Sequence, residues 1–162
     1  MKKILMLLFT ILISGCGFSP MFVGQDTDIY IVPISGINGI ELRNALSAKF
    51  GGVRDASAKY TLTIKLSEPA TKRKALEQTG DAAWQEISIT ATYSLTETAS
   101  GRVLTKGRDS ASESYTFVQY LVASNASYNN AIKNILNVLS DKISARVITT
   151  THTLVTSAKE TK

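Results

Sequence analysis

Few residues in this chain combine the types and the spacing that catalytic chemistry requires. The only histidine, His152, lies in a Thr-rich segment, and the only cysteine, Cys16, lies near the start of the chain. The 13 acidic residues are scattered, so they indicate neither a catalytic carboxylate pair nor a metal site. The sequence also lacks a Gly-rich phosphate loop and a Gly-x-Ser-x-Gly nucleophile motif. It therefore predicts a protein that is not an enzyme and that needs no metal or cofactor.

The leader before Cys16 indicates what chemistry this cysteine can do. Lys2 and Lys3 form a basic start, and residues 4–13 (ILMLLFTILI) are an apolar run, a combination typical of a signal peptide. A membrane-spanning helix needs about 20 apolar residues, so the run is too short to remain as a span. We expect residues 1–15 to be a signal peptide that is removed.

The four residues that end at the cysteine, Ile13-Ser14-Gly15-Cys16, resemble the bacterial lipobox. The resemblance implies cleavage just before Cys16, a diacylglycerol on its sulfur and acylation of its amine. Two or more acyl chains give stable anchoring where one does not. The alternative is a plain signal peptide followed by a cysteine without this role. Gly17 replaces the Asp that resembles an inner-membrane retention signal, which favours an outer-membrane lipoprotein that faces the periplasm.

The rest of the chain has the size and charge of one ordinary domain. Removing Lys2 and Lys3 from the 18 basic residues leaves 16 against 13 acidic ones, a net charge of +3. This charge could favour an anionic partner, but it is too small to indicate binding of nucleic acid. We expect a lipidated cysteine and tether over residues 16–26, a single domain over residues 27–148 and a polar C-terminal tail over residues 149–162.

Alternation of apolar and polar side chains predicts the strands of this domain. Residues 60–66 (YTLTIKL) and 87–95 (ISITATYSL) alternate clearly, and residues 102–117 do so after a turn at residues 96–101. The last two segments favour a hairpin. Residues 29–34 (IYIVPI) form a shorter β-rich run, in which Pro33 indicates a strand end or an edge.

Two segments have the period of amphipathic helices. In the first, Asn38 is a candidate N-cap with Glu41 three residues later, as in a capping box, and the glycines at 51–52 end the helix after residue 50. The second begins near residue 127, and its apolar stripe extends to Val147. The predicted order of elements is therefore β-α-β-β-β-α.

These elements predict an α+β fold, a two-layer sandwich with a four-stranded mixed sheet and two helices on one face. The first two strands should be parallel and joined by a right-handed connection. No element remains to cover the other face of the sheet, on which Ser88, Thr90, Thr92 and Ser94 are expected to lie. This face either meets water, as in many antiparallel sheets, or meets a polar protein wall.

The start of the mature chain, together with the order of elements, resembles the lipopolysaccharide-assembly lipoproteins of the LptE family. The sequence CGFSP at residues 16–20 matches the start of that family, except that Ser19 stands where Arg is frequent. The segments SASESYTF and ASYNNAIKNILNVLSDKISARV resemble the last strand and the terminal helix of the family. The likeness extends over nearly all of the mature chain.

The resemblance implies a role without catalysis. It implies that the protein sits inside the lumen of the outer-membrane barrel LptD, assists the assembly of that barrel, plugs it, and helps deliver lipopolysaccharide to the outer leaflet. Ser88, Thr90, Thr92 and Ser94 would then form an interface with the barrel, because barrel lumens are polar. The alternative is a periplasm-facing lipid-binding lipoprotein, or an auxiliary of another lipid-transport system, with an apolar pocket between helices and sheet.

Lys72, Arg73 and Lys74 form the basic run, which is the only run of three basic residues in the chain. The sequence places it in the connection between the second and third predicted strands. Such a run is often only a solvated loop. It could also contact the phosphates of lipopolysaccharide, since Arg offers a planar fork of donors and Lys a compact ammonium.

Overall fold

The structure is a computed structural model that describes residues 27–76, 82–118 and 120–160. The predicted signal peptide and Cys16 with its tether lie outside the described residues. The elements in chain order are β1 (Ile29–Ile31), α2 (Ile37–Lys49), β2 (Tyr60–Leu66), β3 (Ala70–Leu76), β4 (Ala82–Glu97), β5 (Val103–Val118) and α3 (Leu121–Glu160). The α+β fold with a mixed sheet and two helices is confirmed, but the sheet has five strands where four were predicted.

The sheet is organised around the long strand β4. β5 pairs antiparallel with β4 along nearly its whole length. On the other edge of β4, β2 pairs with the half that ends at Glu97, and β3 pairs with the half that begins at Ala82. β1 pairs parallel with β2, which confirms the predicted parallel start, and β4 and β5 form the predicted hairpin.

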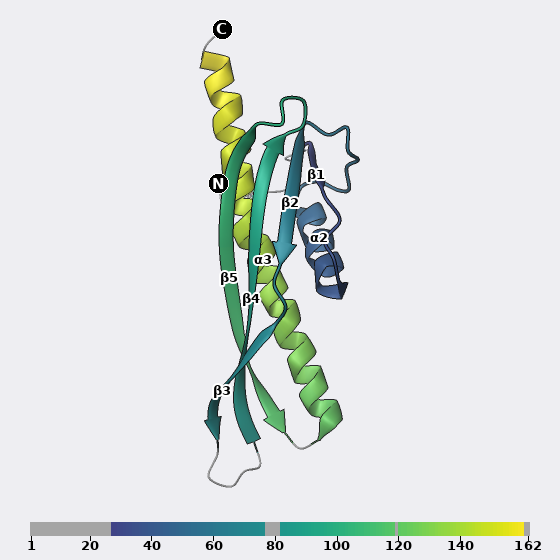
Figure 1. Ribbon diagram of the computed structural model, residues 1–162, viewed down its shortest axis with the longest axis vertical. Coiled ribbons are helices and arrows are strands. Elements are labelled where there is room, and N and C mark those ends of the chain that lie inside the picture. The colour runs from purple at the N-terminus through teal and green to yellow at the C-terminus, as the bar shows by residue number, and fades with distance from the viewer. Residues whose placement is uncertain (1–26, 77–81, 119, 161–162) are drawn as a thin grey trace, which may run out of the picture.

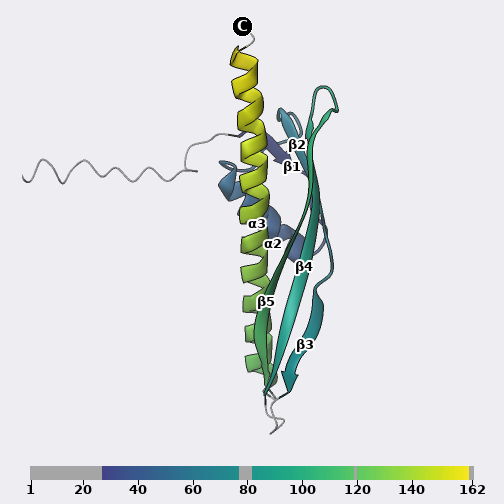
Figure 2. The ribbon, with the colours of Figure 1, turned by 90° about the vertical axis from the view of Figure 1, so that its left-hand side faces the viewer.

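Both helices lie on the same face of the sheet, so the molecule has two layers (Figure 2). The face of β4 below the helices carries Ile87, Ile89, Ala91, Tyr93 and Leu95, all of them buried. The helices contribute buried side chains to the same core, among them Leu42, Leu46, Leu139, Ile143 and Val147. The alternation in β4 therefore buries one face of the strand, as the sequence predicts.

The molecule is elongated and has two regions (Figure 1). We call the broad region the body; it consists of β1, α2, β2 and residues 89–97, 103–111 and 136–151. We call the narrow region the arm; it consists of β3 and residues 82–88, 112–118 and 121–135. The sheet of the body lies under two helices, whereas α3 is the only described element that covers the arm.

The first helix does not begin as predicted. α2 starts at Ile37 after Gly36, and no side chain caps its N-terminus, so the capping box at Asn38 and Glu41 is wrong. Gly36 has a φ of 83°, a conformation that side chains disfavour, and this glycine sets the entry of the chain into the helix. At the other end, Gly51 has a φ of 86°, so the predicted glycine stop is confirmed.

The second helix is longer than predicted at both ends. α3 begins at Leu121 rather than near residue 127, and residues 149–160, expected in a polar tail, continue it. The hydroxyls of Thr149, Thr150 and Thr153 donate to carbonyls four residues earlier, at 2.8, 2.9 and 2.9 Å. Because these bonds satisfy the hydroxyls inside the helix, a Thr-rich segment can remain helical.

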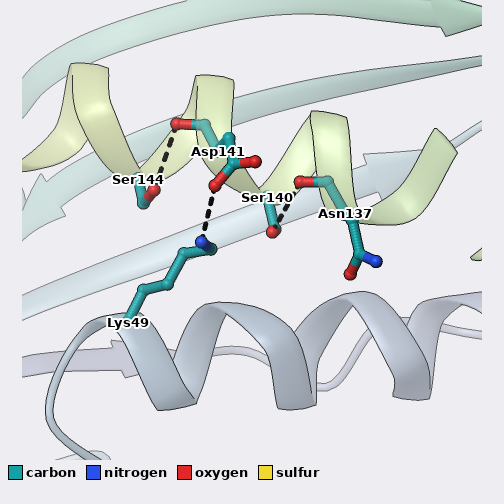
Figure 3. Close-up of polar contacts among 5 residues, drawn as sticks. All are labelled: Lys49, Asn137, Ser140, Asp141 and Ser144. Atoms are coloured by element: carbon teal, nitrogen blue, oxygen red, sulfur yellow. Dashed lines mark hydrogen bonds and ion pairs between the residues drawn. The ribbon is translucent and has the colours of Figure 1, made fainter. Parts of the chain in front are cut away.

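The two helices meet through small buried serines and one ion pair (Figure 3). Ser140 and Ser144 are buried on α3, and their hydroxyls donate to the carbonyls of Asn137 and Asp141 at 2.8 and 3.1 Å. Lys49 Nζ of α2 lies 2.6 Å from Asp141 Oδ1. Serines that bond their own helix leave little bulk between the helices, which permits their close approach.

Candidate functional site on the outer sheet face

The face of the sheet that points away from the helices is the candidate site, and we call it the outer face. Ser88, Thr90, Thr92 and Ser94 lie on this face, because they alternate along β4 with the buried residues below the helices. The pairing registers place Thr63, Ser110 and Ser112 opposite Ser94, Thr90 and Ser88. Thr61 and Ser114 lie on the same face, two residues further along β2 and β5. The outer face is therefore a continuous hydroxyl-rich surface, as the sequence predicts; its role as an interface stays a prediction.

Ser88 and Thr90 form side-chain hydrogen bonds within the sheet, whereas Thr92 and Ser94 do not do so among the described residues. Thr90 Oγ1 and Ser110 Oγ lie 2.9 Å apart, and Ser88 Oγ donates to the carbonyl of Ala70 at 3.4 Å. The side chains of Thr92 and Ser94 make no such bond within residues 27–76, 82–118 and 120–160. These two hydroxyls can therefore bond water or a partner at no cost to the fold.

Three basic side chains that the sequence pattern does not single out surround Thr92 and Ser94. Lys65 of β2 and Arg108 of β5 both lie opposite Thr92, and Lys106 of β5 lies opposite Ser94. All three are exposed. The alternation in β2 could have revealed Lys65. In β5, the inner positions next to Lys106 and Arg108 are not apolar. The sequence therefore shows no alternation that would assign these two residues to the outer face.

The basic run is not in the connecting loop that the sequence predicts. It belongs to β3, an edge strand in which Lys72 lies opposite Glu86 and the register shifts between Arg73 and Ala75. Lys74 Nζ lies 2.7 Å from Glu86 Oε2, whereas Lys72 and Arg73 have no such partner in the described part of the chain. Two exposed cations of the run therefore remain available, and their contact with lipopolysaccharide stays a prediction.

A polar cluster on the inner face of the body joins the sheet to α3. The hydroxyl of Tyr93 donates to Asp109 Oδ2 at 2.8 Å, and Arg146 Nη2 lies 3.8 Å from Asp109 Oδ1. A Cβ atom at Gly107 would overlap the ring of Tyr93, so glycine makes room for the ring to cross β5. Burial, followed by the hydrogen bond to Asp109, raises the pKa of Tyr93 to about 12. The phenol thus stays protonated near neutral pH and is no general base.

The sequence expectations concern metal-binding groups and membrane-spanning helices, and the described residues have the following properties. Within those ranges, no group of three or more His, Cys, Asp and Glu side chains is placed to hold a metal ion. No helix in the same ranges is long and apolar enough to cross a membrane.

The chain matches one family by sequence. Residues 27–147 match the model of the family described as LptE, lipopolysaccharide-assembly. The match covers β1 through most of α3, and so includes the whole outer face and the basic run. No curated protein matches the chain by sequence.

Several solved lipoproteins share the fold. A candidate lipoprotein from Caulobacter crescentus CB15 has a TM-score of 0.63 at 20% identity, over 76% of this chain and 89% of that one. The rare lipoprotein B from Shewanella oneidensis has a TM-score of 0.54 at 13% identity, over 78% and 97% of the two chains. A minor lipoprotein from Acinetobacter baumannii has a TM-score of 0.51 at 13% identity, over 74% and 90%. At these identities the likeness establishes the fold alone.

Proposed function

Because the chain belongs to the LptE lipopolysaccharide-assembly family, we propose that it assists the assembly of the outer-membrane barrel LptD and plugs its lumen. In this proposal, acyl chains on Cys16 anchor the protein in the outer membrane, and the protein helps deliver lipopolysaccharide to the outer leaflet. It does so without catalysis and without a cofactor. Its partners are the barrel, lipopolysaccharide and the membrane that holds the acyl chains.

The observation that carries the proposal is the hydroxyl-rich outer face. A strand face that meets an apolar partner would expose apolar side chains, but the outward positions of β4 from Ser88 to Ser94 are all Ser or Thr. The lumen of an outer-membrane barrel is polar, so a plug needs hydrogen-bonding side chains on the face that meets it. The hydroxyls of Thr92 and Ser94 bond no other residue in the described part of the chain.

The shape of the molecule also supports the proposal (Figure 1). α3 has 40 residues, which corresponds to a length of about 60 Å at 1.5 Å per residue. β4 and β5 have 16 residues each, or about 50 Å. A membrane with its headgroup regions is about 40–45 Å thick. A narrow molecule of this length is suited to a lumen that crosses the membrane.

The alternative, a lipid-binding carrier, would need an apolar pocket between the helices and the sheet. The side chains that meet there include Leu42, Leu46, Leu62, Leu139 and Ile143, none of which has any measurable exposure. A layer filled in this way favours a plug or adaptor over a carrier.

The test is to capture the tagged full-length protein from outer membranes and to measure how much barrel protein comes with it. The double substitution Thr90→Trp/Thr92→Trp adds neutral bulk to the outer face. We expect it to leave the protein folded, because both positions point away from the core, and to reduce capture of the barrel at least about tenfold, which corresponds to about 1.4 kcal/mol.

The matched control is Lys133→Trp/Asn137→Trp, which adds the same bulk to exposed positions of α3. We expect it to retain capture of the barrel. Equal loss in both double variants would contradict the assignment of the interface to the outer face. If the wild-type protein brings no barrel with it, the proposed function is wrong.

A further inference from the structure

We propose that the outer face docks against a protein wall that carries carboxylates, with Lys65, Lys106 and Arg108 as its basic contacts. We call these three residues the cation cluster. The inference rests on the proposed function, because it assigns a chemistry to the wall that the outer face would meet. It concerns a different set of residues from the basic run on β3.

Strand pairing in the sheet sets the spacing of the cation cluster. Lys65 and Arg108 flank Thr92 from the two strands beside β4, so their backbones are about 10 Å apart, which is two strand spacings. Lys106 and Arg108 are two residues apart on β5, or about 7 Å along the strand. The three cations thus frame the two free hydroxyls of Thr92 and Ser94.

The fold itself does not neutralise the cation cluster. The ion pairs of the described residues join Lys49 to Asp141, Lys74 to Glu86, Arg102 to Glu97 and Arg146 to Asp109, and none of them includes the cluster. The acidic residues of β5, Asp109 and Glu113, alternate with the outward positions and lie on the inner side. Like charges this close repel one another because they lie within about one Debye length. This repulsion destabilises the isolated fold, and carboxylates of a partner would relieve the repulsion.

The geometry of the cation cluster favours carboxylates on a facing β-wall over the phosphates of a glycan. The cations do not converge on one point; they are spaced over a pleated face at the repeat of the strands. A facing sheet presents alternate side chains at the same spacing of about 7 Å along each strand and about 5 Å between strands. Acidic residues on such a wall can meet each cation while its polar groups bond Thr92 and Ser94.

The experiment measures the association rate of the full-length protein with the purified barrel at low and at high ionic strength. The variant Lys65→Glu/Lys106→Glu/Arg108→Glu reverses the cluster at exposed positions. The control, Lys59→Glu/Arg102→Glu/Lys133→Glu, makes the same change in net charge at exposed positions outside the cluster. Complementary charges raise association rates and make them dependent on salt. We expect the cluster variant to associate at least about tenfold more slowly at low salt. The control should slow much less, because its charges lie outside the proposed interface.

Circular dichroism and thermal unfolding establish that each variant is folded. If the Glu variant does not fold, Lys65→Gln/Lys106→Gln/Arg108→Gln removes the charge without reversing it and should lower the salt dependence of association. An unchanged association rate in a folded cluster variant overturns the inference but leaves the proposed function intact, since the wild-type protein still binds the barrel. Purified lipopolysaccharide is the second probe. If the cluster variant loses lipopolysaccharide and keeps the barrel, the occupant is a phosphorylated glycan and the inference is wrong.

Discussion

The body and the arm share β4, β5 and α3, yet they are held together by different means. The largest fully buried side chains lie in the body, except Ile87 and Ile135 of the arm and Phe50, which directly follows α2. The arm buries fewer large aliphatic side chains and adds aromatic and polar contacts, such as the edge-to-face pair of Tyr115 and Tyr128, whose ring centroids are 5.6 Å apart. At its end the arm also exposes apolar side chains, with Leu121 79% exposed. The difference indicates that a second helix, rather than longer strands, gives the body its core.

The body and the arm should differ in stability. Fully buried aliphatic side chains contribute most to stability, because their removal loses both apolar burial and packing. The body should therefore set the free energy of unfolding of the whole chain, whereas the arm should open locally at lower free energy.

The largest effect should follow from a cavity in the body. Leu139 lies on α3 between the two layers and is fully buried, so Leu139→Ala should lower the free energy of unfolding by about 2–5 kcal/mol. The neighbouring Val138 is 42% exposed, and Val138→Ala should cost about 0.5 kcal/mol or less. Urea unfolding monitored by circular dichroism measures both. Equal costs in the two variants would contradict the view that the buried core of the body determines the free energy of unfolding.

A smaller effect should follow from the close approach of two strands in the body. In Gly107→Ala, the added methyl group overlaps the ring of Tyr93, and the ring must move away from Asp109, to which it donates a hydrogen bond. Overpacking of this kind costs about 1–3 kcal/mol. In the background of Tyr93→Leu, the same change should cost much less, because the ring is absent. A cost that is identical in both backgrounds would mean that the overlap is not the cause.

The sequence predicts those strands and helices in which buried apolar side chains recur at a regular spacing. In β4, buried Ile and Leu side chains alternate with Ser and Thr, so the sequence correctly predicts both the strand and its outer face. Strand β3 was missed because its residues 71–74 are exposed on both faces and have no apolar period. β4 offers them a free edge, and that pairing overrides their weak preference for strand.

Two residues of the candidate site could not be assigned to a face because the strand that carries them has no apolar period. Gly107 and Asp109 occupy inner positions of β5, one to admit the ring of Tyr93 and the other to bond it. Because neither is apolar, the alternation that would assign Lys106 and Arg108 to the outer face is not visible in the sequence. The start of α2 was misplaced for a related reason, since a backbone glycine, Gly36, sets the entry of the helix where a side-chain cap was expected.

The smallest effect should be confined to the arm. The hydroxyl of Tyr115 donates to Gln85 Oε1 at 2.7 Å across β4 and β5, and Tyr115→Phe removes this bond while keeping the ring against Tyr128. A hydrogen bond of this kind contributes about 1 kcal/mol, so hydrogen exchange should become faster in residues 82–88 and 112–118. Exchange in residues 60–66 and 91–97 should not change, because the core of the body remains intact. The control is Tyr30→Phe in β1, whose hydroxyl has no hydrogen-bond partner among the described residues. If Tyr115→Phe makes amides of the body exchange faster to the same extent, the body and the arm unfold as one unit, and the distinction between them does not hold for stability.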